Sequence, residues 1–526
     1  MAQDSSVSRR AVIKRAIAAG GAAAGSTWLS SCSSSPTVAW DQQADVLVVG
    51  YGGAGAAAAI TAAESGASVM ILEKAPEAGG NTAVSSGSMR LPSDREKTAQ
   101  FLKAIGLGAI DDEMARAVAG LWVELEDWFS ARGGRLAISP AAARWAGVFP
   151  GAEAIDRMAT VERPDEYIGV GRDLFAFLDG VVRKQSRITV ALSTPVTRLV
   201  QNPATRAIEG VVAEREGKTI RIKANRGVIM ALGGFEANRA MLATYVEEAP
   251  VPIAVSGTPY NTGDGIRMAL DVGADLWHMN GVEWARDGFK PPDLPAAFWL
   301  QPKASAWISV NRQGRRFRDE SVTYGHAKKH LEVFHFDMRE SRWLNHPWYL
   351  VFDEKTRKAG PIVMVQRAAG RAPFVTYNLA RGLHTWSTDN GPEIERGWIL
   401  RGATIRELAG ATGIDPAGLE DSVKRYNGFC LRRTDADFGR DPRQLQPIDT
   451  PPFYAMECVV NLINTQGGPR RNSRGQVLGA YGDPIPRLYS CGEFGSIFGF
   501  LYPGGCNLPE CIISGIIAGR AASSER

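Results

Sequence analysis

The stretch from Asp45 to Glu73 limits the possible folds of this chain more than any other, because it reads as strand, glycine turn, helix and strand. Asp45 to Val49 is a short apolar run, too brief for a helix, and glycines in the spacing G-x-G-x-x-G follow it directly. An alanine-rich helix and a second apolar run from Ser68 to Leu72 complete a β-α-β unit. Glu73 then stands where a carboxylate accepts hydrogen bonds from a ribose. This context predicts a dinucleotide-binding unit in an α/β, Rossmann-like fold.

The residues of this glycine motif have separate physical roles. Gly50 permits the tight turn, Gly52 lets backbone N–H groups approach a pyrophosphate, and Gly55 lets the helix pack close to the sheet. Gly53 and Ala54 lie between them, at a helix N-terminus whose partial positive charge favours phosphate. A β-α-β unit without a ligand is the alternative explanation of the same pattern.

Composition excludes some classes of function. The length of 526 residues allows roughly two to four domains, and 44% hydrophobic residues can build sizeable cores. The 60 lysines and arginines nearly balance the 56 aspartates and glutamates, and there is no long basic run, so nucleic acid is not an expected partner. The six cysteines form no C-x-x-C pair, and the histidines have no metal-binding spacing beyond a chance pair, His326 and His330. We therefore expect no metal site.

The N-terminus has the pattern of an export signal. Ser8 to Lys14 contains two adjacent arginines and resembles a twin-arginine signal, and a weakly apolar, Ala/Gly-rich stretch from Ala16 to Leu29 follows it. The residues before Cys32 also resemble a lipobox, which would make Cys32 an acylated N-terminus and the attachment to a membrane. We expect residues 1–43 to be signal and linker and the protein to be exported to the periplasm or cell envelope. A disordered basic tail is the alternative.

The loop after the second strand carries a resemblance to a known family. Lys74 to Thr82 contains Gly-Gly-Asn-Thr, and Ser85-Ser86-Gly87 follows. The sequence here resembles the flavoprotein family of fumarate reductases, flavocytochromes c and 3-ketosteroid dehydrogenases, whose second strand runs into an E-K-x-x-x-x-G-G-N-T loop. Small and hydroxyl-bearing residues let the backbone surround a pyrophosphate and the edge of a flat ring. The resemblance implies FAD, and non-covalent binding because this segment has no histidine for attachment.

The resemblance also implies a domain organisation and a set of cofactor contacts. Residues 44–257 and 450–526 would form a Rossmann-like FAD-binding domain, interrupted by an inserted α+β substrate domain at residues 258–449. Near the C-terminus the family places a Gly-Glu pair at the ribityl chain and a helix N-terminus under the pyrimidine edge of the flavin. The contacts that the motif and the family imply are Gly50, Gly52, Gly53, Ala54, Gly55, Glu73, Lys74, Gly80, Asn81, Thr82, Ser86, Gly87, Val196, Gly233, Asp264, Gly492, Glu493, Asn507 and Leu508.

The inserted domain contains the family's active-site motif with changes that concern the substrate. Ile308 to His326 resembles a V-N-x-x-G-x-R-F-x-N-E hairpin that ends at the flavin. Where fumarate reductases carry an arginine proton donor, this sequence has Tyr324, and Tyr502 stands near the place of their carboxylate-binding arginine. The histidine before the Gly-Gly of the penultimate strand is missing too. Two buried carboxylates would be poorly paired without these cations, which argues against a small dicarboxylate substrate.

Tyr324 and Tyr502 match the pattern of 3-ketosteroid dehydrogenases and imply a mechanism. Tyr502, with a backbone N–H near Gly505 or Cys506, would bind the carbonyl oxygen, Tyr324 would abstract the adjacent proton, and a hydride would pass to flavin N5. A tyrosine with a pKa of about 10 is a poor base unless its surroundings stabilise the phenolate. We expect an oxidoreductase of CH–CH bonds next to a carbonyl group, acting on a 3-ketosteroid or similar cyclic ketone. An exported ene-reductase of an unsaturated acid or enone and a flavin electron carrier without its own substrate are the alternatives.

Two further expectations concern the pocket and the redox partner. Five aromatic residues of the insert would either line a pocket for a flat apolar ligand or form core. The sequence has no second G-x-G-x-x-G for a nicotinamide cofactor and no C-x-x-C-H for haem, so an external quinone, cytochrome or small carrier is the expected electron partner. The aromatic residues are Trp277, Trp284, Phe298, Trp299 and Trp307.

Overall fold

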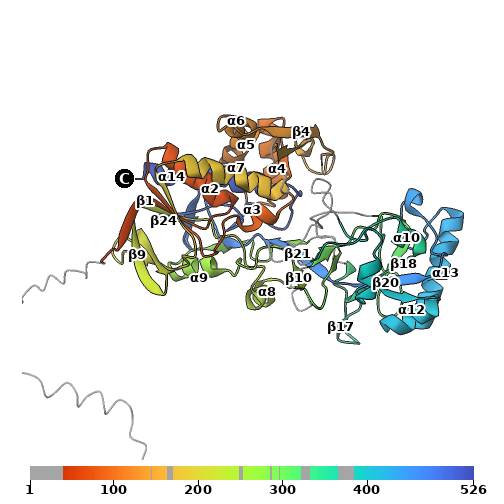
Figure 1. The fold of residues 1–526 in the computed structure, drawn as a ribbon. Helices are drawn as coiled ribbons and strands as arrows, with labels where there is room; N and C mark the ends of the chain where they lie inside the picture. Colours follow the sequence, from red (N-terminus) through yellow and green to blue (C-terminus); the bar gives the residue numbers. More distant parts are fainter. Residues whose placement is uncertain are drawn as a thin grey trace, which may run out of the picture. The chain divides into compact units, whose positions relative to one another are not determined.

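The computed structural model describes residues 39–143, 145–162, 170–247, 253–284, 287–294, 297–321, 332–364 and 384–525. Trp40–Arg526 forms one compact unit, which Figure 1 shows as a coloured ribbon. The expected twin-arginine signal, Cys32 and Tyr324 lie outside the described residues, so export and acylation stay predictions. Within the described ranges, no helix is both long enough and apolar enough to span a membrane.

The largest sheet has five parallel strands at its centre. Their order is β24, β9, β1, β2 and β6, and the antiparallel β23 extends the sheet beyond β24. Segments from both halves of the chain therefore lie side by side, and the expected α/β, Rossmann-like class is confirmed. The strands are β1 (Gln42–Val49), β2 (Val69–Leu72), β6 (Ile188–Ala191), β9 (Lys218–Met230), β23 (Gln476–Leu478) and β24 (Pro484–Ser490), with β7 (Val196–Gln201) and β8 (Ile208–Arg215) continuing antiparallel from β9.

The two faces of this sheet are covered by different elements, because side chains alternate along each strand. Val46 and Val48 belong to the core that contains the helices α2 (Gly53–Glu64) and α14 (Asn507–Ser524). Leu47 and Val49 belong to a second core together with β7 and β8. Burying each such side chain stabilises the fold by about 1.5–3 kcal/mol. The sheet is therefore apolar on both sides, as expected for a parallel sheet.

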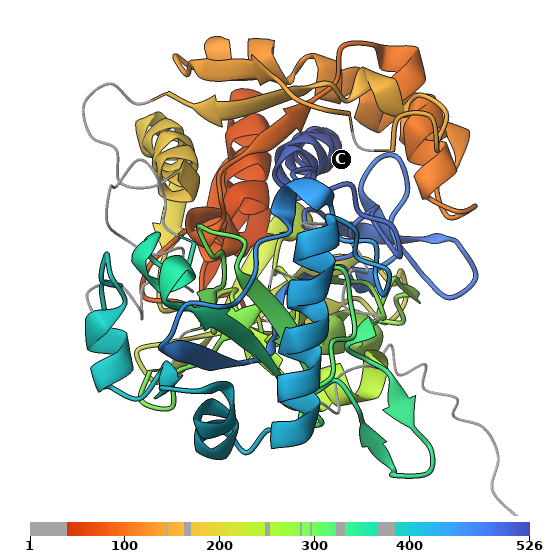
Figure 2. The ribbon, with the colours of Figure 1, turned by 90° about the vertical axis from the view of Figure 1, so that its right-hand side faces the viewer.

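Two glycines let α14 lie directly on α2, and Figure 2 shows the two helices side by side. A Cβ atom on Gly515 would lie 2.5 Å from the carbonyl oxygen of Ala54, and one on Gly519 would lie 2.6 Å from that of Ala58. No side chain fits at either position without moving backbone. The glycines of α14 thus set how closely the C-terminal helix approaches the helix of the glycine motif.

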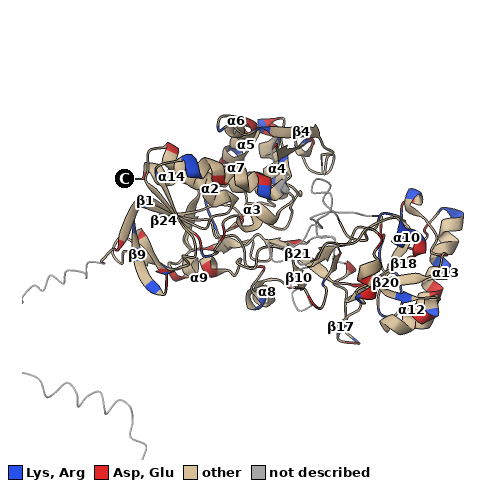
Figure 3. Ribbon diagram, in the orientation of Figure 1, with Lys and Arg blue, Asp and Glu red and all other residues tan. Residues whose placement is uncertain are grey.

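The remaining sheets are smaller, and α12 and α13 cover one of them. Ile308 and Val351 of its strands share a core with Leu408 and Val423 of the two helices. Lysines and arginines are interspersed with aspartates and glutamates along the ribbon (Figure 3), in line with the near-neutral composition. The sheet contains β15 (Trp307–Val310), β18 (Trp348–Asp353), β20 (Phe453–Cys458) and β19 (Leu400–Gly402), and the helices are α12 (Ile405–Thr412) and α13 (Pro416–Arg432).

A three-stranded sheet joins segments from both sides of the predicted insert. Its order is β10, β21 and β12, in which β10 and β21 are parallel. The proposed domain boundaries at residues 258 and 449 stay predictions. These strands are β10 (Ile253–Val255), β12 (Val282–Trp284) and β21 (Val460–Thr465), and a further sheet has the order β3 (Met89–Leu91), β5 (Arg157–Val161) and β4 (Leu136–Pro140).

The other elements complete the chain. They are α3 (Gly80–Val84), α4 (Arg95–Ile105), α5 (Asp112–Val123), α6 (Leu125–Ser130), α7 (Val170–Lys184), α8 (Arg239–Tyr245), α9 (Asp264–Asp271), α10 (Glu354–Lys358) and α11 (Gly391–Glu395), with the two-residue strands β11 (Leu276–Trp277), β13 (Gly288–Phe289), β14 (Phe298–Trp299), β16 (Phe336–Asp337), β17 (Arg342–Trp343) and β22 (Gly468–Pro469).

The contact between α2 and α14 predicts opposite effects for two glycine substitutions. Gly515→Ala should lower the free energy of unfolding by about 1–3 kcal/mol, because the added methyl group meets backbone. Gly410→Ala, at an exposed position of α12 with nothing near its Cβ, should raise it by about 0.5–1 kcal/mol through helix propensity. Urea unfolding of the two variants measures both effects. Equal shifts in the same direction would contradict the packing account.

Candidate active site

A cavity of about 380 Å³ lies where the parallel strands of the large sheet end. The segments that follow β1, β2, β9 and β24 all line it, and so does the beginning of α14. The carboxyl ends of parallel strands are the usual place of ligand binding in open α/β sheets. The topology therefore brings the glycine motif, the loop after β2 and the C-terminal segment to one site.

The glycine turn has the shape of a phosphate cradle. Gly50 has a φ of 105°, and a Cβ there would lie 2.2 Å from the carbonyl oxygen of Ala231, so only glycine fits. At Gly52 the nearest atom to an added Cβ is 3.7 Å away, which leaves the backbone open toward the cavity. The helix α2 begins next to it, and its N-terminus favours an anion. These residues fit the pyrophosphate of a dinucleotide.

Glu73 is held at the end of β2 by two backbone groups. Its Oε2 accepts a hydrogen bond from the N–H of Tyr51 at 2.7 Å, and its Oε1 accepts one from the N–H of Ala75 at 2.8 Å. Burial raises the pKa of Glu73, and the two N–H groups oppose that rise. Each oxygen keeps a further lone pair, so the carboxylate can still accept hydrogen bonds from a ribose.

Lys74 is bound to the neighbouring loop. Its Nζ lies 2.6 Å from Oδ2 of Asp264 and donates to Oγ1 of Thr262 at 2.6 Å. Both charged groups are partly exposed, so the pair contributes little stability. The pairing instead neutralises the positive charge of Lys74, which lines the cavity.

Asn81 of α3 connects three segments at the cavity wall. Its Nδ2 donates to Oε1 of Glu236 at 2.8 Å and to Oε2 of Glu493 at 3.1 Å, and its Oδ1 accepts from the N–H of Thr258 at 2.8 Å. Sequence reasoning missed Glu236, although an acid directly after the Gly-Gly-Phe turn was a signal that could have been followed. Asn81 thus holds the loops after β9, β10 and β24 together.

Tyr502 lies in the segment just before α14 begins and lines the cavity. Its hydroxyl oxygen accepts hydrogen bonds from the N–H groups of Cys506 at 3.0 Å and Asn507 at 3.1 Å. Burial raises the pKa of Tyr502 well above its usual value, and the two N–H groups oppose that rise only in part. The phenol is therefore protonated at neutral pH. A hydroxyl that accepts two hydrogen bonds becomes a stronger donor through its own hydrogen.

One wall of the cavity is apolar. Trp299, Met364 and Ile463 form a cluster there. The indole Nε1 of Trp299 donates to Oγ of Ser256 at 2.8 Å, and that hydroxyl donates to Oδ1 of Asn461 at 2.6 Å, which fixes the ring. The other four aromatic residues expected at a pocket do not line this cavity, and sequence reasoning missed Met364 and Ile463.

Cations are scarce among the described residues that line the cavity. Arginine and histidine are absent from that set, and Lys74 is the lysine in it. Because Lys74 is paired with Asp264, the described lining offers no free cation for a substrate carboxylate.

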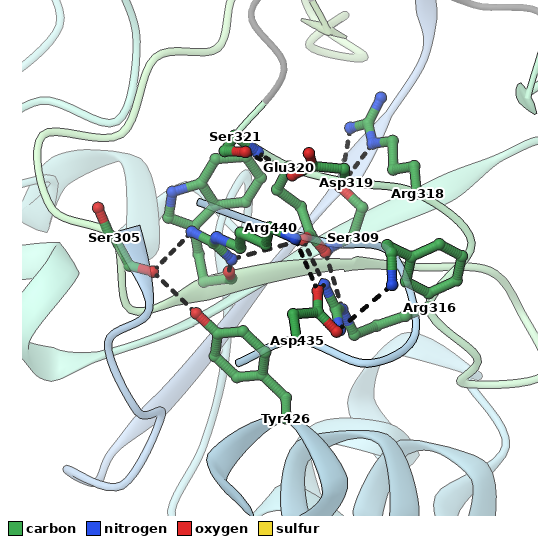
Figure 4. A network of polar contacts seen from close by, with 12 residues as sticks. Ser305, Ser309, Arg316, Arg318, Asp319, Glu320, Ser321, Tyr426, Asp435 and Arg440 are labelled. Carbon is green, nitrogen blue, oxygen red and sulfur yellow. Dashed lines mark hydrogen bonds and ion pairs between the residues drawn. The ribbon is translucent and has the colours of Figure 1, made fainter. Parts of the chain in front are cut away.

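Three charged residues of the Ile308 to His326 motif, Arg316, Arg318 and Glu320, form ion pairs inside the protein (Figure 4). Nη2 of Arg316 lies 2.6 Å from Oε2 of Glu320 and 2.9 Å from Oδ2 of Asp435, and Arg440 lies 3.5 Å from Glu320. Arg318 pairs with Asp287 and donates to Oγ of Ser309 at 2.7 Å. These three charged side chains are therefore structural.

The same network fixes the chain just before Tyr324. The N–H of Asp441 donates to Oγ of Ser321 at 3.1 Å, and Ser321 is the last described residue of the motif. Arg440 donates to the carbonyl oxygen of Trp307 at 2.6 Å, which connects the segment that contains Asp441 to β15. Tyr324 and His326 lie outside the described residues.

Most of the expected cofactor contacts lie around one cavity. Gly55 and Gly87 do not line this cavity. Gly55 instead packs against the carbonyl oxygen of Gly50. Direct contact with a cofactor stays a prediction for each residue. Those that line the cavity are Gly50, Gly52, Gly53, Ala54, Glu73, Lys74, Gly80, Asn81, Thr82, Ser86, Val196, Gly233, Asp264, Gly492, Glu493, Asn507 and Leu508.

Comparisons with known proteins agree with this geometry. A family model described as "FAD binding domain" matches residues 45–508. Urocanate reductase of Eggerthella lenta is 28% identical over 91% of this chain and 74% of its own length. The 3-oxosteroid 1-dehydrogenase of Mycolicibacterium smegmatis is 28% identical over 88% of this chain and 94% of its own length. The crystal structure of 3-ketosteroid delta1-dehydrogenase from Sterolibacterium denitrificans superposes with a TM-score of 0.75 at 23% identity, covering 92% of this chain and 100% of that one.

The buried network of Figure 4 predicts a large effect for one arginine and a small effect for another. Arg316→Met should lower the free energy of unfolding by about 3–5 kcal/mol, because it leaves the Glu320 and Asp435 carboxylates short of a cation. Arg406→Met breaks an exposed pair with Glu420 and should cost below about 1 kcal/mol. Chemical denaturation of the two variants measures the difference. Comparable losses would show that the network is not a buried ion-pair cluster.

Proposed function

Because the chain belongs to the FAD-binding domain family, we propose that it oxidises the carbon–carbon bond next to the carbonyl group of a neutral cyclic ketone, such as a 3-ketosteroid. The family and the relatives make the protein a FAD-dependent oxidoreductase of the class that acts on CH–CH or C=C bonds. Bound FAD supplies the hydride acceptor. The cavity's own residues support the choice of a ketone.

Tyr502 carries the proposal. Its phenol stays protonated, and the N–H groups of Cys506 and Asn507 hold its oxygen at the N-terminus of α14. A donor in this position binds a ketone oxygen more strongly as negative charge develops there, and the helix N-terminus stabilises the same charge. Proton removal from the adjacent carbon thereby becomes easier.

The lining of the cavity supports a neutral, apolar ring rather than an acid. Trp299, Met364 and Ile463 offer an apolar wall, and Trp299 is fixed by Ser256. Leaving a substrate carboxylate without a cation in a buried site is costly. An unsaturated dicarboxylate therefore fits this cavity poorly. An enone fits it as well as a ketone does, because reduction of an enone would be the reverse of the proposed reaction on the same residues.

The remaining roles rest on the sequence. Tyr324, the proposed base, follows three residues after Ser321, whose position the network of Arg440 and Asp441 fixes. An external quinone, cytochrome or small carrier would exchange electrons with the enzyme, and binding of FAD would be non-covalent. Export to the periplasm or cell envelope remains part of the proposal.

Anaerobic bleaching of the flavin tests the substrate class. Saturated 3-ketosteroids and simpler cyclic ketones should bleach the yellow holoprotein, and succinate should not. The Tyr324→Phe variant should keep its colour in both cases. Bleaching by succinate alone, or reoxidation of the reduced enzyme by fumarate or urocanate but not by enones, would refute the proposal. A protein that none of these ketones bleaches and that no enone, fumarate or urocanate reoxidises would be an electron carrier.

Replacing the proposed carbonyl donor should slow the reaction without loss of cofactor. We expect Tyr502→Phe to lower kcat/KM for the ketone by about 10²–10³, the usual cost of one such donor. Tyr481→Phe changes a tyrosine that is 98% exposed and should leave kcat/KM unchanged. Steady-state kinetics, with the FAD content measured by absorbance, give the comparison. Undiminished turnover of Tyr502→Phe would exclude this role.

A further inference from the structure

Two carboxyl groups, those of Glu236 and Glu493, meet at one amide beside the cavity. Both accept hydrogen bonds from Nδ2 of Asn81, at 2.8 and 3.1 Å, so these two oxygens lie within about 6 Å of each other. Glu236 is 1% exposed, and Glu493 is partly exposed and lines the cavity. At this separation away from bulk water, two negative charges destabilise each other strongly.

Within the described residues, the contacts of these two carboxyl groups are polar but uncharged. Along the described chain neither carboxyl group has an ion-pair partner, and their contacts are amides and a hydroxyl. Arg471, which donates to the carbonyl oxygen of Gly492 at 3.3 Å, is paired with Glu510 of α14 at 2.7 Å. The other titratable groups near Glu493 are Cys491 and Cys511, which burial keeps as neutral thiols by raising the pKa of each.

Hydrogen bonding decides which carboxyl group carries the charge. Glu236 accepts from Asn81, from Nδ2 of Asn261 at 2.7 Å and from Oγ1 of Thr465 at 3.3 Å. Among the described residues, the side chain of Glu493 accepts a hydrogen bond from Asn81 alone. Donors stabilise a carboxylate, so the negative charge is favoured on Glu236 and the proton on Glu493. Burial and then the charge of Glu236 raise the pKa of Glu493 well above its usual value.

We infer that Glu493 faces the cavity as a neutral carboxylic acid, held in that form by the buried carboxylate of Glu236. Glu493 then offers bound FAD one O–H donor and one carbonyl acceptor, and adds no negative charge beside a cofactor that already carries two phosphates. This inference rests on the FAD site and is independent of the ketone reaction.

The inference makes FAD binding depend on pH. A group with a raised pKa is protonated below that pKa and loses its proton as the pH rises through it. If the protonated form binds FAD, the dissociation constant should rise by up to about tenfold per pH unit above the pKa of Glu493 in the apoprotein. Glu236→Gln removes the neighbouring charge, so the rise should begin at lower pH.

The test is a fluorescence titration of the apoprotein with FAD between about pH 6 and about pH 9. Glu493→Gln keeps a donor and an acceptor without a charge, so its dissociation constant should stay within about threefold of wild type at the lower pH and should not change with pH. Glu77→Gln removes an exposed carboxylate at the rim of the same cavity. It should shift the dissociation constant equally at every pH.

Two results would overturn the inference. One is FAD binding by Glu493→Gln that is at least about tenfold weaker than wild type at every pH, which would show that a carboxylate is required. The other is a pH dependence of the FAD dissociation constant that is the same in Glu236→Gln as in wild type. Should Glu236→Gln fail to fold, infrared spectroscopy of the wild-type apoprotein decides the matter. A protonated carboxyl band that Glu493→Gln removes supports the inference, and its absence from wild type refutes it.

Discussion

The close contact between α2 and α14 is the constraint on which the site depends. Gly515 lies on Ala54 and Gly519 on Ala58, so the contacts advance by four residues in the same direction on both helices, which therefore run parallel. Parallel helices place their positive N-terminal ends on the same side. Both ends line the cavity, one beside the glycine turn and the other beside Tyr502. An anionic cofactor offsets the repulsion between the two aligned dipoles.

The rest of the site follows from what surrounds these helix ends. One begins at a turn in which only glycine fits, and so exposes backbone N–H groups to a phosphate. The other begins beside a buried phenol, whose oxygen it holds with two N–H groups. The same device, a helix N-terminus, thus fits cofactor binding beside the glycine turn and, in the proposed reaction, carbonyl activation beside Tyr502.

Sequence reasoning identified the local parts of this site and missed the parts that depend on distant contacts. The unit from Asp45 to Glu73 could be predicted because its strand, turn and helix are encoded in consecutive residues. The place of Glu236 after the Gly-Gly-Phe turn was a signal, but its role could not be predicted, because that role depends on Asn81, 155 positions away. Arg316 and Arg318 belong to a motif that the resemblance places next to the active site, yet their partners Asp435 and Asp287 come from separate segments and make them structural. The lack of a free cation in the described cavity lining likewise depends on the pairing of Lys74 with Asp264, which spans 190 positions.

A crystal structure of the holoenzyme with a bound cyclic ketone tests the central claim most directly. The account predicts the flavin in the cavity between the glycine turn and the start of α14, the ketone oxygen at hydrogen-bond distance from the Tyr502 hydroxyl, and the ring of the ketone against Trp299. A ketone bound with its oxygen away from Tyr502, or a flavin outside this cavity, would contradict it.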